Sequence, residues 1–142
     1  MIVIDASIWV SFLVQQDLNY PKTHLWLTNI ITSRVPIVAP VLLLSEVGGA
    51  IARRLNQPAL GNKAVNQILS IPTLHLIAID HPLGIKTGKL AASYKLRGAD
   101  AVYVSLASEL NLPLLSWDKE KISRASQIIK TYTPDNAPSI SI

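Results

Sequence analysis

The 142-residue chain contains no cysteine, so neither disulfide bonds nor thiolate metal ligands hold it together. This absence is typical of proteins of the reducing cytoplasm, where we expect the chain to be located. No basic leader precedes the first apolar residues, and we expect no signal peptide. The longest apolar stretch, 35–52, is interrupted by Pro36, Pro40 and Glu46, which argues against a membrane span.

Acidic residues are also few. Nine Asp and Glu stand against thirteen Lys and Arg, and the formal net charge is +4. Eleven of the thirteen basic residues follow residue 50. A basic excess suits a polyanionic partner such as nucleic acid, but many ordinary proteins share it. Charge alone therefore leaves nucleic-acid binding open.

Hydrophobic residues make up 49% of the chain, which suffices for one substantial core at this length. Short apolar runs alternate with longer helical patterns, and this alternation predicts an α/β fold with a mostly parallel central sheet of four to five strands. We expect one domain over 1–133 and a loose tail over 134–142. The expected strands are 2–5, 37–39, 74–79, 113–115 and 128–132. The expected helices are a first one around 8–13, then 21–33, 40–55, 59–69, 82–96, 99–110 and 118–125.

Four acidic residues stand in apolar settings, and we call them the acid cluster: Asp5, Glu46, Asp100 and Asp118. Asp5 and Asp118 each follow a short apolar strand, at the end where parallel sheets bind ligands. Asp100 begins an almost wholly apolar helix. Glu46 lies inside a helix whose residues three and four positions away are Leu, Gly and Ala, so no basic residue can pair with it locally. This distribution suggests a shared site.

A structural role is open for each of these residues. Asp is a favoured helix N-cap, and taken singly Asp5, Asp100 and Asp118 are better explained as caps than as catalysts. An arginine from elsewhere in the fold would satisfy Glu46. Asp80 illustrates the ambiguity, because it also ends an apolar strand. We interpret Asp80 as a cap, since its strand is expected at the edge of the sheet.

Taken together, the four acids favour a metal site. Two carboxylates 4 Å apart repel by about 4 kcal/mol at an effective dielectric near 20. Without a cation some of them would have to stay protonated, and a hard divalent cation removes this conflict. Oxygen ligands without Cys or a suitable set of His favour Mg²⁺ or Mn²⁺ over Zn²⁺. Such an ion acidifies a bound water and orients a phosphodiester.

In the segments that carry these acids, the sequence resembles the PIN domain family, and in particular the VapC-like toxins of bacterial toxin–antitoxin pairs. The segments are, in chain order, IVIDASIWV, APVLLLSEVGGAIAR, LRGADAVYVSLASEL and LPLLSWDKE. The resemblance covers about 1–133. It implies a three-layer αβα sandwich and metal-dependent endonucleolytic cleavage of RNA by an activated water.

The resemblance also implies roles for single residues. Asp5 and Asp100 are the expected direct metal ligands, and Asp118 is a ligand directly or through water. Glu46 completes the catalytic acids and positions or deprotonates the attacking water. The expected supporting and substrate-binding residues are Ser116, Ser7 and, as a weaker candidate for phosphate contact, Arg97.

The partners implied by the resemblance are RNA as substrate, a second copy of the chain, and a small antitoxin protein that inserts a segment into the acidic cleft. Two other functions stay open. One is a non-catalytic RNA- or protein-binding module with the same fold. The other is a phosphatase with Asp5 as nucleophile, although Ser7 stands where many such enzymes carry a second acid.

Overall fold

A five-stranded sheet forms the centre of the computed structural model, which describes residues 1–139. The strands are β1 (Ile2–Ile4), β2 (Ile37–Pro40), β3 (Leu74–Ile77), β4 (Leu114–Leu115) and β5 (Thr131–Tyr132). Their order is β3-β2-β1-β4-β5 and every neighbouring pair is parallel. The expected parallel sheet is confirmed, and so is the position of the third strand at an edge.

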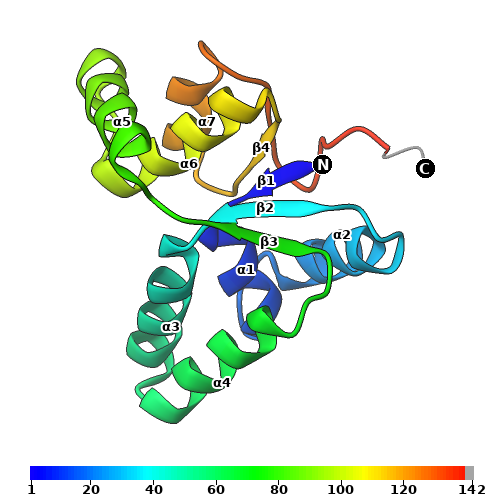
Figure 1. Ribbon diagram of the computed structural model, residues 1–142. Coiled ribbons are helices and arrows are strands. Elements are labelled where there is room, and N and C mark those ends of the chain that lie inside the picture. The colour runs from blue at the N-terminus through cyan, green and yellow to red at the C-terminus, as the bar shows by residue number, and fades with distance from the viewer. Residues whose placement is uncertain (140–142) are drawn as a thin grey trace.

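Helices cover both faces of this sheet, so the molecule has the three layers of an αβα sandwich (Figure 1). The helices are α1 (Ala6–Leu13), α2 (Tyr20–Thr32), α3 (Leu42–Leu55), α4 (Pro58–Leu69), α5 (His81–Tyr94), α6 (Gly98–Leu110) and α7 (Lys119–Ala125). In Figure 1, α1 to α4 lie below the sheet and α5 to α7 lie above it. Both faces of the sheet are therefore withdrawn from water, which explains why β1, β2 and β4 are buried along their whole length.

The core explains why α6 is apolar on nearly all sides. Seven consecutive residues of α6, 101–107, are buried, and this helix contacts β1, β2 and β4. On the opposite face, Trp9 of α1 is among the largest fully buried side chains. The expectation of a buried helix over 99–110 is confirmed.

The direction in which successive strands are added to the sheet reverses between β1 and β4, and this topology positions the candidate site. The chain runs outward from β1 to β2 and β3 on one side, then continues with β4 and β5 on the other. Ile4 pairs with Leu115, and the Asp5 N–H donates to the Leu115 carbonyl at 3.1 Å. The residues that follow the two strands, Asp5 and Ser116, consequently lie side by side where α/β proteins bind ligands.

Some expected element ends are wrong. The fifth strand covers only Thr131–Tyr132, because the N–H groups of Ile128 and Ile129 both donate to the Ala125 carbonyl and form a turn after α7. The third strand ends at Ile77, two residues early. Pro40 ends β2 and does not begin α3.

The C-terminal segment is described as far as residue 139. Its part over 134–136 forms a turn, and Asp135 pairs with Lys22 at 3.0 Å. The rest of the expected loose tail, 140–142, lies outside the described residues. In the part of the chain that the structure describes, no helix combines the length and apolarity needed to cross a membrane.

Candidate active site

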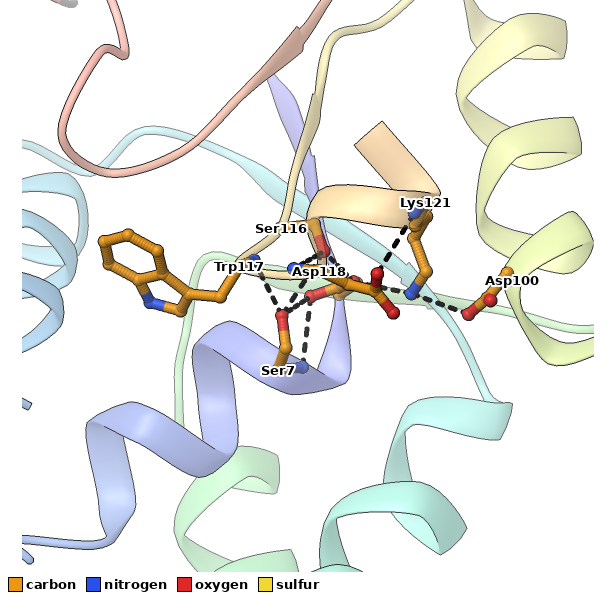
Figure 2. A network of polar contacts seen from close by, with 7 residues as sticks. Ser7, Asp100, Ser116, Trp117, Asp118 and Lys121 are labelled. Atoms are coloured by element: carbon orange, nitrogen blue, oxygen red, sulfur yellow. Dashed lines mark hydrogen bonds and ion pairs between the residues drawn. The ribbon is translucent and has the colours of Figure 1, made fainter. Parts of the chain in front are cut away.

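Asp5 is the centre of a polar network at the carboxyl end of the sheet. Figure 2 shows this network with Ser7, Ser116 and Lys121 labelled. The Asp5 side chain is fully buried, and one carboxylate oxygen, Oδ1, accepts from the Ser7 N–H at 3.0 Å and the Ser7 hydroxyl at 2.5 Å. The other, Oδ2, accepts from the Ser116 hydroxyl at 2.5 Å and from Lys121 Nζ at 2.6 Å. Only the Ser7 N–H contact caps α1, so a capping role accounts for one contact of four.

Lys121 of α7 links the acids to one another. Its ammonium lies 2.6 Å from Asp5 Oδ2 and 2.9 Å from Asp100 Oδ1, and its side chain is 6% exposed. The same nitrogen lies 5.0 Å from the centre of the Tyr103 ring. The backbone N–H of residue 121 donates to Asp118 Oδ1 at 3.1 Å. One residue therefore contacts three of the four members of the acid cluster.

The charge of Lys121 is favoured in this setting. Burial by itself would lower the pKa of the ammonium, but the carboxylates of Asp5 and Asp100 outweigh burial and raise this pKa above its usual value. The group at the centre of the cluster is thus a permanent cation near neutral pH.

Sequence reasoning missed Lys121. The available signal was its position: Lys121 and Ala125 are four residues apart in the helix expected after Asp118, and both are buried on one face of α7. A lysine on the inward face of a helix that starts at a site acid is placed to reach that site.

The structure separates Asp100 from the two capping acids. Asp118 caps α7, but the N-cap position of α6 is held by Arg97, so capping does not account for Asp100. Asp118 is also held by Ser116, whose hydroxyl accepts from the Asp118 N–H at 3.0 Å. A small cavity is lined by Arg97, Asp100, Asp118 and Lys121, so the candidate phosphate-contacting arginine borders the cluster.

Glu46 approaches the cluster from α3. Its Oε1 atom is buried and has no hydrogen-bond partner within residues 1–139, and no ion pair there joins it to an arginine. Burial raises the pKa of Glu46, and the charges of Asp5 and Asp100 act in the same direction, while Tyr103 and Lys121 oppose them. Glu46 therefore carries a proton more readily than an ordinary glutamate does.

A larger cavity of about 410 Å³ adjoins the cluster. Its lining includes Ser7, Glu46, Arg53 and Trp117. Trp117 packs on the core, and its Nε1 donates to the Thr23 hydroxyl at 2.8 Å. The lining of this cavity thus includes the half-buried Glu46 and a basic residue, Arg53.

The donor atoms suit a hard divalent cation, because they are carboxylate oxygens. Asp5 and Asp100 already share one cation position, and the Lys121 ammonium fills it. Within residues 1–139, no three Asp, Glu, His or Cys side chains are placed to hold one metal ion. A divalent ion therefore fits this site only once Lys121 has withdrawn from it.

Comparison with known proteins places the chain in a family. A family model described as PIN domain matches residues 2–127, whereas comparison with curated proteins gives no significant match. The fold is similar to that of VapC20 from Mycobacterium tuberculosis, described as a sarcin–ricin loop cleaving toxin, with a TM-score of 0.73, 14% identity and coverage of 87% of this chain and 94% of that chain.

Two further solved structures have the same fold. VapBC2 from Rickettsia felis, bound to a DNA fragment from its promoter, has a TM-score of 0.71 and 15% identity over 94% of this chain and 98% of that chain. A toxin–antitoxin complex from Klebsiella pneumoniae has a TM-score of 0.67 and 16% identity over 94% and 98%. Since the family model covers most of the chain and agrees with the observed sheet topology, this protein belongs to the PIN domain family.

Proposed function

We propose that the chain is an endoribonuclease of the VapC toxin type that hydrolyses RNA phosphodiesters at the acid cluster. One observation carries the proposal: Asp5 after β1 and Asp100 in α6 direct their carboxylates to one shared cation, at 2.6 and 2.9 Å. Asp100 has no capping role that would explain this placement. Paired carboxylates at the carboxyl end of a parallel sheet suit phosphodiester hydrolysis.

We propose Mg²⁺ or Mn²⁺ as the cofactor, with Asp5 and Asp100 as direct ligands after withdrawal of Lys121 and Asp118 as a ligand directly or through water. PIN domain proteins generally use a divalent metal. When bound, such an ion supplies charge stabilisation for the phosphate and a more acidic water.

The remaining residues have roles that follow from their contacts. Ser7 and Ser116 hold the Asp5 carboxylate in one orientation through both of its oxygens. Glu46, with its raised pKa, is suited to exchange a proton with the attacking water. Arg97 at the small cavity and Arg53 at the larger one are placed to contact RNA phosphates.

The test of this function is the loss of RNA cleavage in Asp100→Asn. Asp100 suits the test better than Asp5, because Asp100 is partly exposed whereas Asp5 is fully buried and accepts four hydrogen bonds. With Mn²⁺ and a pool of total RNA, we expect cleavage to fall by about a hundredfold or more, since one carboxylate of the shared pair is lost.

Asp80→Asn is the matched control. Asp80 caps α5 through the Leu83 N–H, and asparagine is an equally good N-cap, so cleavage by this variant should equal that of the wild type. Full cleavage by a correctly folded Asp100→Asn variant would remove Asp100 from the mechanism.

A second candidate function is a non-catalytic RNA- or protein-binding module, and Lys121 is the observation that favours it. The buried Lys121 ammonium already pairs with Asp5 and Asp100, so these two carboxylates have a cation without a catalytic metal. Wild-type protein that binds RNA but cuts none of it across a range of Mn²⁺ concentrations would select this alternative. The phosphatase alternative is disfavoured, because both oxygens of the Asp5 carboxylate are engaged by donors and the side chain is fully buried.

We also propose a homodimer that binds a small antitoxin protein. Leu18 and Leu25, next to and within α2, are 94% and 67% exposed and offer apolar surface to a partner. Co-expression with the neighbouring reading frame, followed by size-exclusion chromatography with light scattering, should yield a complex that contains two copies of the chain. A lone monomer would count against both partners.

A further inference from the structure

We infer that the Lys121 ammonium is the resident cation of the acid cluster and competes with divalent ions for Asp5 and Asp100. The inference concerns the regulation of the site named above, and it rests on the proposed function only for the identity of that site. Its test measures metal binding and needs no RNA.

The Asp5 carboxylate is saturated with hydrogen-bond donors. A carboxylate offers about four lone-pair positions, and the Asp5 carboxylate accepts from four donors. A metal ion can bind Asp5 only where one donor leaves. Two of the donors belong to Ser7 in the first turn of α1, and the Ser116 hydroxyl is also fixed by the Asp118 N–H. The side chain of Lys121, with four rotatable methylene groups, is the donor that can leave Asp5 without a movement of the backbone.

The charge of Lys121 also opposes a divalent ion at this position. The Lys121 ammonium lies between Asp5 and Asp100, so a divalent ion bound to the same two carboxylates would lie within a few ångströms of it. Like charges at such distances repel strongly where water is excluded, and the Lys121 side chain is 6% exposed. Lys121 and the metal therefore exclude each other from this position.

Two further contacts hold Lys121 in the site. Its backbone N–H donates a hydrogen bond to the Asp118 side chain, and its ammonium lies over the Tyr103 ring. These contacts hold the lysine in the site, so a metal ion has to overcome them as well as the two ion pairs. We expect weak binding of divalent ions to the wild-type protein as a consequence.

The experiment compares Mn²⁺ affinities of wild type and Lys121→Met, measured by electron paramagnetic resonance of free Mn²⁺. Methionine keeps the apolar part of the lysine side chain and removes its charge. We expect Lys121→Met to bind one Mn²⁺ at least about tenfold more tightly than the wild type, because the competing charge is gone. Lys119→Met is the control, since Lys119 is exposed on the same helix and its loss changes the net charge equally. The control should bind Mn²⁺ like the wild type.

The location of the bound ion is checked in Lys121→Met/Asp100→Asn, which should lose the gained affinity. Retention of the gain in this double variant would place the ion elsewhere and overturn the inference. Equal Mn²⁺ affinities of wild type and Lys121→Met would overturn it as well.

Lys121→Gln is a second variant for the case in which Lys121→Met does not fold, and it should show the same tighter binding. Folding of Lys121→Met only in the presence of Mn²⁺, followed by circular dichroism, would support the inference directly. Tight Mn²⁺ binding by the wild type overturns it even when neither variant folds. If the chain is no nuclease, RNA stays uncut while the Mn²⁺ affinities of the variants still follow the predicted pattern. This outcome would contradict the proposed function and leave the inference about Lys121 supported.

Discussion

Without metal, replacement of Lys121 by methionine is expected to lower the free energy of unfolding by about 3–5 kcal/mol, as is typical when one partner of a buried ion pair is removed. The variant leaves the Asp5 carboxylate, which is fully buried, with no opposite charge at its Oδ2 atom. Asp100 loses its ion partner at the same time. Urea denaturation in the presence of EDTA, followed by circular dichroism, measures the change.

A double-mutant cycle separates the ion pair from other effects of the substitution. In Asp5→Asn/Lys121→Met neither buried charge remains, and the new amide can donate to the Ser116 hydroxyl. We expect this double variant to recover more than half of the stability that Lys121→Met loses, because well-packed neutral groups often replace a buried ion pair at little cost. Lys119→Met should stay within about 0.5 kcal/mol of the wild type, as exposed substitutions do. Strictly additive losses in the cycle would mean that Asp5 and Lys121 are not coupled.

These expectations depend on a residue that the sequence did not single out. The segments with their acids could be predicted, since each Asp follows a strand or begins a helix in a recognisable pattern. The identity of the neutralising cation could not, because it depends on α7 bringing Lys121 next to the end of β1. That approach follows from the pairing of β1 with β4, which is a property of the sheet order and leaves no local trace.

Whether an acid of the cluster only caps a helix also depends on the fold. The capping interpretation is confirmed for Asp5 and Asp118, which are both N-caps and also contact Lys121. Their catalytic role stays a prediction. Asp100 is no cap, although its position near a helix start suggested one. Local patterns thus predict an acid at a strand end or helix start. Whether that acid also contacts the other acids and Lys121 depends on the neighbours that the fold brings to it.

Element types were predicted well where the periodicity is long, and element ends less well. The run over 128–132 has the apolar character of a strand, but the chain leaves α7 through a turn that uses the N–H groups of Ile128 and Ile129. These groups cannot pair with β4 as well. A hydrogen-bonded turn therefore overrides the strand preference of two isoleucines.

The segment over 58–69, to which the sequence assigned no motif, supports the site through its packing. It forms α4, which lies along α3, the helix that carries Glu46. The two backbones approach closely: a Cβ atom on Gly61 of α4 would lie 2.5 Å from the Gly48 carbonyl oxygen and 3.0 Å from the Ala52 Cβ. Only glycine allows this approach without a shift of one helix.

Gly61→Ala is consequently expected to destabilise the protein by about 2–3 kcal/mol, despite a gain in helix propensity of about 1 kcal/mol. Gly88→Ala in α5 is the matched control, because a Cβ there meets nothing within 4 Å and the helix-propensity gain remains unopposed. The two variants should change the urea midpoint in opposite directions. A shift of the same sign and size in both would show that the α3–α4 contact tolerates a methyl group. If α3 moves to relieve the clash, Glu46 moves with it, so Gly61→Ala should also weaken RNA cleavage although residue 61 lies outside the acid cluster.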